Sequence, residues 1–157
     1  MPIAIYYLRD PFAPAPNREP ICGSDVLVYA GDKILLSHKK DNFQWGIVAG
    51  GMKDNETFKA CAIRVLIEQT GIHVKSDSLQ DIGIFDEPSR IVSFLEGEIA
   101  RLITLAFAVE VEENTPSTAG DESLELRWVR IEDLANYRLT VTDEEIIKRW
   151  LDGQEAE

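Results

Sequence analysis

The chain has 157 residues, a formal net charge of −12 and a hydrophobic content of 45%. This length predicts one domain, over residues 1–157, with a sizeable core, and the acidic balance argues against a long nucleic acid as partner. No apolar run is long enough to span a membrane, and the opening residues MPIAIYYLRD lack the pattern of a signal peptide. Because Cys22 and Cys61 have no metal-binding or redox spacing, we expect reduced thiols in a cytoplasmic protein.

The first 24 residues predict a short edge strand and then an extended arm. Residues 3–8 (IAIYYL) have the apolar and aromatic character of a strand. Four prolines follow within residues 11–20, which favours an irregular arm as part of the segment 1–24. Two placements of the arm stay open, since it either crosses to a second subunit or lies on the surface of its own domain.

Residues 25–40 predict a β-hairpin. The segments DVLVYA and KILLSHKK flank Gly31-Asp32, and glycine at the first central position fits a type II′ turn. A segment that contains Trp45 then leads into a loop with the paired glycines Gly50 and Gly51.

The stretch 50–72, GGMKDNETFKACAIRVLIEQTGI, predicts a loop followed by a helix. Asp54 or Asn55 can cap the start of the helix, and Gly71 suits a left-handed C-terminal cap. Apolar residues fall on two sides of the helix at about 100° per residue, with Arg64 on the narrow polar stripe between them. Such a helix is expected to lie between two layers of the domain.

This stretch resembles the Nudix box, G-x5-E-x7-R-E-U-x-E-E-x-G-U, where U is a bulky aliphatic residue. The matching positions are Gly50, Glu56, Arg64, Leu66, Glu68, Gly71 and Ile72. Val65 stands where the family has the glutamate after the arginine, and Gln69 replaces the second glutamate of the pair. The resemblance implies an α/β (α+β) fold, an α/β/α sandwich with a mixed central sheet.

The resemblance also implies a divalent cation, Mg²⁺ or Mn²⁺, held by carboxylates on one face of the helix. Val65 cannot coordinate a cation and Gln69 offers only a carbonyl oxygen, so Glu68 is the one charged ligand left and we expect weak affinity. Arg64 is expected to pair with Glu56 and hold the loop to the helix. Glu56, Arg64 and Glu68 are therefore candidate catalytic residues, with an ordinary ion pair between loop and helix as the alternative.

The glycine loop and its tryptophan also fit the family. Trp45 precedes Gly50 and Gly51 as a family tryptophan often precedes a Pro-Gly-Gly loop, with Ala49 in place of the proline. The resemblance implies that Trp45 stacks on a base and that loop N–H groups approach phosphate oxygens. A core role for Trp45 and a purely conformational role for the glycines stay open.

The second half of the chain predicts more strands. Residues 79–85 alternate loosely as a strand, and residues 91–101 form either a hairpin or a lid. The run LITLAFAVEV at 102–111 is typical of a strand buried on both faces, as in a central sheet between helices. Arg90 and Arg101 flank the undecided segment, and each is either a substrate-binding residue for phosphate or ribose or a solvated cation.

Residues 122–130 contain a second family pattern, E-x4-R-W, formed by Glu122, Arg127 and Trp128. In several Nudix proteins this glutamate reaches the metal from the opposite side as a ligand or general base. Glu122 is therefore a candidate catalytic residue and metal ligand, together with Glu68 and Gln69, and an exposed loop acid is the alternative.

The C-terminal region predicts a helix that packs on the domain. Thr142-x-x-Glu145 reads as a capping box, and Asp143 suits the positive end of the helix dipole. Gly153 is expected to end the helix, which leaves residues 153–157 as a frayed acidic tail.

Two functions follow from the resemblance. The first is a hydrolase that cleaves the diphosphate linkage of a nucleoside triphosphate, ADP-ribose or a nucleotide sugar by metal-assisted attack of water on phosphorus. The second is a catalytically inactive nucleotide-binding or regulatory module on the same fold. Either function predicts a small nucleotide as partner, and the family resemblance adds a homodimer as an expectation.

Overall fold

The computed structural model describes residues 4–155. The strands are β1 (Ala4–Tyr7), β2 (Ile21–Ala30), β3 (Lys33–Lys39), β4 (Trp45–Gly46), β5 (Val48–Gly51), β6 (Gln80–Phe85), β7 (Ile91–Phe94), β8 (Ile99–Glu110) and β9 (Ser123–Arg130). The helices are α1 (Phe58–Thr70) and α2 (Val141–Glu155), and short 3₁₀ helices span Ser76–Ser78 and Ile131–Asn136. Neither α1 nor α2 has the length and apolar character needed to cross a membrane.

The centre of the sheet is the parallel pair β2 and β8. They run in register from Ile21 opposite Leu102 to Tyr29 opposite Glu110. Strands β3 and β5 pair with β2 in the antiparallel sense, and β6 and β7 pair with β8 in the same way. The sheet is therefore mixed, as predicted.

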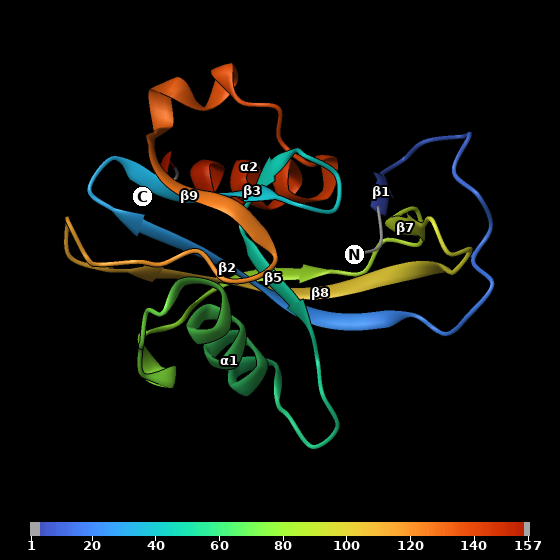
Figure 1. Ribbon diagram of the computed structural model, residues 1–157, viewed down its shortest axis with the longest axis horizontal. Coiled ribbons are helices and arrows are strands. Elements are labelled where there is room, and N and C mark those ends of the chain that lie inside the picture. Colours follow the sequence, from blue (N-terminus) through green and yellow to red (C-terminus); the bar gives the residue numbers. More distant parts are fainter. Residues whose placement is uncertain (1–3, 156–157) are drawn as a thin grey trace.

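The two helices cover opposite faces of this sheet, with α1 below it and α2 above it in Figure 1. Side chains on a strand alternate between the faces. Val26 and Val28 pack in the cluster that includes α1, whereas Leu27 packs in the cluster with α2. On β8, Phe107 belongs to the α1 side and Ala106 to the α2 side. This confirms the predicted α/β/α sandwich and the strand buried on both faces.

The N-cap of helix α1 lies two residues after Asn55 and three after Asp54, the two predicted caps. Thr57 is the N-cap, and its hydroxyl accepts a hydrogen bond from the backbone N–H of Ala60 at 3.0 Å. Asn55 has a φ of 69° and belongs to the turn before the helix, so the choice of Asp54 or Asn55 was wrong. The predicted end is confirmed, because Gly71 is left-handed with a φ of 76° and donates to the carbonyl of Ile67.

Helix α2 differs from prediction at both ends. Thr142 lies inside the helix, and the first backbone bonds run from Asp143 and Glu144 to the carbonyl of Thr140. The helix continues through Gly153 to Glu155, while residues 156–157 of the predicted frayed tail lie outside the described part. The capping box fails because the Glu145 carboxylate binds arginine side chains instead of its own helix start.

The N-terminal arm lies on its own domain. After β1 pairs with β7, the arm returns along the hairpin that β7 forms with β8. Asn17 makes three hydrogen bonds there: its N–H donates to the carbonyl of Ile99, its Oδ1 accepts from the N–H of Ile99, and its Nδ2 donates to the carbonyl of Gly97. Residues 91–101 are therefore a hairpin, and the arm lies along it within this chain.

The burial of α2 gives a test of the core. Ile146 is fully buried on the α2 side of the sheet, so Ile146→Ala should lower the free energy of unfolding by about 2–5 kcal/mol. Ile84, which is 52% exposed on β6, provides the matched control, and Ile84→Ala should cost less than about 1 kcal/mol. Urea unfolding followed by circular dichroism measures both, and equal losses would contradict this assignment of the core.

Candidate functional site

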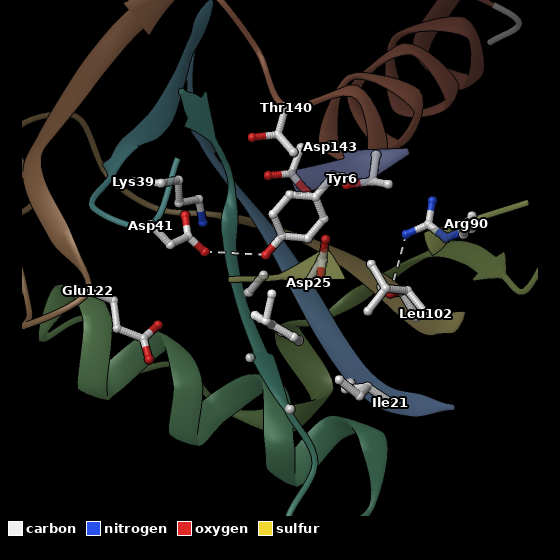
Figure 2. A pocket seen from close by; sticks show the side chains of 17 residues that line it. Tyr6, Ile21, Asp25, Lys39, Asp41, Arg90, Leu102, Glu122, Thr140 and Asp143 are labelled. Atoms are coloured by element: carbon white, nitrogen blue, oxygen red, sulfur yellow. Dashed lines mark hydrogen bonds between the residues drawn. The ribbon is translucent and has the colours of Figure 1, made fainter. Parts of the chain in front are cut away.

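A cavity of about 340 Å³ opens between β1, the first half of β2, the glycine loop and the start of α2. Gly50 and Gly51 form part of its wall, and Glu122 lies beside them. The remaining lining residues named below come from segments far apart in the sequence, and Figure 2 shows them gathered around the same space. This volume lies at the lower end of the range for small-molecule pockets.

Two buried aspartates face each other in this cavity. Asp25 on β2 is 7% exposed and Asp143 on α2 is 6% exposed. Burial raises the pKa of Asp25 well above its usual range, and the nearby charge of Asp143 raises it further. Burial also raises the pKa of Asp143, whose Oδ2 accepts a hydrogen bond from the N–H of Ile47 at 3.2 Å. The pair therefore holds a proton at a higher pH than exposed aspartates do.

Further polar groups complete this end of the cavity. The Tyr6 hydroxyl donates to Oδ2 of Asp41 at 3.4 Å, and burial raises the pKa of Tyr6. The Lys39 ammonium donates to the carbonyl of Ile47. Sequence reasoning missed all of these residues together with the aspartate pair, because only the pairing of β1, β2 and β3 with their neighbours brings them to one place. An aspartate inside an otherwise apolar strand, as in DVLVYA, was the one available signal.

The two candidate arginines lie in different places. Arg90 lines the cavity although it is only 1% exposed, and its Nη1 donates to Oε1 of Glu145 at 2.8 Å. The guanidinium also lies over the ring of Phe85, with its central carbon 5.4 Å from the ring centre. Arg101 is not among the cavity-lining residues, and its Nη2 donates to the carbonyl of Asp86. The structure thus places only Arg90 at the cavity.

The candidate residues of the box join the glycine loop to α1. Nε and Nη2 of Arg64 donate to the two carboxylate oxygens of Glu56 at 2.6 and 2.9 Å, so the predicted pair is present. Arg64 also donates to Glu68 at 2.7 Å and to the carbonyl of Gly51 at 2.8 Å. The hydrogen bonds from Arg64 lower the pKa of Glu56 to about 2. None of these three side chains lines the cavity, which they border through the loop.

The expected metal face holds hydrogen bonds and an apolar contact. Nε2 of Gln69 donates to the carbonyl of Ala49 at 2.7 Å and to Oε2 of Glu122 at 2.9 Å. Val65 packs so closely on Gly50 that a Cβ there would lie 2.5 Å from its Cγ2. Within residues 4–155, no three acidic, histidine or cysteine side chains converge as a metal site. In this arrangement the side chains do not form a coordination site for a divalent cation. The metal-binding roles of Glu68, Gln69 and Glu122 stay predictions.

Trp45 lies outside the cavity. Its ring stacks on His38 with a centroid distance of 4.5 Å and meets Tyr137 edge-on at 5.2 Å. The guanidinium carbon of Arg127 lies 4.9 Å from the centre of the Trp45 ring. Trp45, Arg127 and Tyr137 border a separate hollow, so Trp45 and the glycine loop do not line one site.

The buried aspartate pair gives a pH prediction. Because the folded pKa of Asp25 is raised above its unfolded value of about 3.9, the folded state binds more protons and stability falls as pH rises through the folded pKa. Asp25→Asn should remove this part of the fall, so the drop in Tm between pH 5 and pH 8 should be smaller than in the natural chain. The exposed Asp152 is the control, and an Asp25→Asn profile that matches that of Asp152→Asn would contradict the assignment.

Comparisons with known proteins agree with the fold. A family model described as NUDIX domain matches residues 23–150. An RNA pyrophosphohydrolase from Novosphingobium aromaticivorans is 25% identical over 144 residues, which cover 81% of this chain and 86% of the relative.

Solved structures show the same fold at lower identity. The NUDIX domain of Shewanella oneidensis NrtR, complexed with ADP ribose, has a TM-score of 0.69 at 14% identity and covers 92% of this chain and 93% of that one. A bifunctional NMN adenylyltransferase/ADP ribose pyrophosphatase from Francisella tularensis, complexed with AMP and Mn ion, has a TM-score of 0.70 at 22% identity. The match covers 92% of this chain but 43% of the Francisella protein. With the family model matching most of its length, the chain belongs to the NUDIX domain family.

Proposed function

We propose that this protein is a Nudix-type hydrolase that cleaves the diphosphate linkage of a nucleoside diphosphate derivative. The observation that carries the proposal is the cavity of about 340 Å³ beside Gly50 and Gly51, with the carboxylate of Glu122 at the same edge. The cavity is large enough for a nucleoside, and its glycine edge leaves backbone groups accessible to a phosphate.

Hydrogen-bonding groups set the direction of the ligand in this proposal. The inner end of the cavity, which contains Asp25, Asp41 and Asp143, can accept hydrogen bonds from the N–H and O–H groups of a base or ribose. Tyr6 and Phe94 add aromatic wall on which a base can pack. The nucleoside therefore points inward, and the diphosphate lies at the glycine edge.

The relatives support a ligand of this class. The Novosphingobium relative is an RNA pyrophosphohydrolase, and the two solved structures described above contain AMP and ADP ribose. A nucleoside triphosphate, ADP-ribose and a nucleotide sugar all share the diphosphate that the glycine edge would receive, so these three classes are the proposed substrates.

The reaction is attack of water on phosphorus with cleavage of a P–O bond in the diphosphate. Glu122, the carboxylate at the diphosphate end, takes the proton of the attacking water in this scheme. Arg64 acts indirectly, because it holds Gly51 and Glu56 and so fixes the loop that receives the phosphates. The manganese in the Francisella structure suggests dependence on Mg²⁺ or Mn²⁺, although the donor set within residues 4–155 does not fit a cation as it lies.

A second candidate function is nucleotide binding without turnover. One observation favours it: the face that carries carboxylates in the family box presents the apolar Val65 and the amide of Gln69 in this chain, and the amide is engaged with Ala49 and Glu122. Such a protein would bind a nucleotide in the cavity without hydrolysing it.

A substrate panel separates the two functions. Nucleoside triphosphates, ADP-ribose and nucleotide sugars are incubated with the protein in Mg²⁺, in Mn²⁺ and in EDTA, and products are followed by chromatography. We expect hydrolysis of at least one compound, with kcat reduced about 10²–10⁴-fold in Glu122→Gln. Glu96→Gln, at an exposed position in the β7–β8 turn, should leave the rate unchanged.

Binding to the same compounds is measured in parallel by the rise in Tm that a bound ligand causes. A rise with one compound but turnover of none would favour the binding module over the hydrolase. Neither binding nor turnover across the panel would contradict both functions.

A further inference from the structure

The side-chain amide of Gln69 lies between two oxygen atoms that come from different parts of the chain. It is 2.7 Å from the carbonyl oxygen of Ala49 in the glycine loop and 2.9 Å from Oε2 of Glu122 before β9. The side chain of Gln69 reaches both from the C-terminal end of α1, and the residue is only 7% exposed. Three separate segments are thus joined at one nitrogen.

Chemistry fixes which end of the amide faces the two oxygens. A carbonyl and an ionised carboxylate only accept hydrogen bonds, whereas the amide nitrogen carries two N–H donors. One N–H is therefore available for each acceptor. If the carbonyl oxygen of Gln69 faced them instead, three acceptors would meet without a donor, and the buried Gln69 amide would be left unpaired although Glu122 is exposed to water.

The loop that carries Glu122 is also fixed to α1 by its backbone. The N–H of Thr118 donates to the carbonyl of Thr70 at 2.9 Å, and the N–H of Gly120 donates to the carbonyl of Gln69 at 3.1 Å. A Cβ at position 120 would overlap the carbonyl of Glu68, so the loop approaches the helix closely only with glycine there. These contacts hold the loop that carries Glu122 against the end of α1.

We propose that the amide of Gln69 takes the place of a divalent cation in this member of the family. A cation at this point would have one structural task, which is to hold a loop carbonyl and a carboxylate close together against their mutual repulsion. Two N–H groups perform that task here, so the site of this chain is assembled without metal. The inference concerns how the site is held together and does not rest on the proposed hydrolysis.

The central test replaces the side-chain amide of Gln69 with a carboxylate. Gln69→Glu puts a third acceptor, and a second negative charge, against Ala49 and Glu122, so the donor is lost and a cation becomes necessary. In EDTA we expect its Tm to fall by about 5 °C or more below that of the natural chain. Adding Mn²⁺ or Mg²⁺ should restore most of the loss, whereas the Tm of the natural chain should stay the same in EDTA and in either cation.

Two controls test whether the effect is specific to the contact between positions 69 and 122. Gln154→Glu makes the same chemical change at an exposed site near the end of α2, and it should neither lower Tm nor create a response to Mn²⁺. In the double variant Gln69→Glu, Glu122→Gln, an amide is available again on the opposite side, so both the loss in EDTA and the response to Mn²⁺ should shrink.

Two results would overturn the proposal. One is a saturable rise in Tm of the natural chain with Mn²⁺ that Glu122→Gln abolishes, because a cation would then bind at Glu122 in the presence of Gln69. The other is a Gln69→Glu variant that gains no stability from either cation.

If Gln69→Glu does not fold, Gln69→Met decides the matter, because methionine has nearly the same length and no N–H donor. A lowered Tm for Gln69→Met, with no response to Mn²⁺, would support the bridge, and an unchanged Tm would refute it.

Discussion

The parallel pairing of β2 with β8 is the constraint on which the rest of the molecule depends. Each strand is covered on both faces and flanked on both edges, so its side chains must alternate between the α1 and α2 layers. Polar side chains on this pair therefore need partners in the layers: Ser24 donates to the carbonyl of Phe58 on α1, and Asp25 meets Asp143 of α2. Asp25 lies where β2 pairs with β5, opposite Ala49, and its side chain lines the cavity.

Much of the fold was predictable because it is encoded in short-range patterns. The alternation in DVLVYA and KILLSHKK, the apolar run at 102–111 and the left-handed Gly71 each specify local structure within a few residues. Helix starts were less predictable, since Thr57, Asp54 and Asn55 are all good caps and only the path of the loop selects among them. Glu145 shows the limit of such patterns, because its competing partner Arg90 is 55 positions away.

The site was predictable in part for the same reason. Glu56 and Arg64 lie within one stretch, so their pairing could be inferred from a family pattern. Glu122 and Gln69 were both expected as metal ligands, but their direct hydrogen bond was not expected. The direction of the Gln69 amide depends on Ala49 and Glu122, which are 20 and 53 positions away. The sequence pattern placed Asp143 only at the positive end of a helix dipole, and the position of α2 over the sheet is what brings it to Asp25.

Tyr6 has a practical consequence for anyone who defines the boundaries of this domain. The family match begins at residue 23, yet β1 supplies Tyr6 to the wall of the cavity and completes the pairing of β7. An expression fragment cut to the matched region would keep the sandwich and α1 but would open the cavity on one side and leave an unpaired strand edge. A fragment for ligand screening or crystallisation should therefore include the N-terminal strand. An affinity tag or fusion partner is better attached after α2.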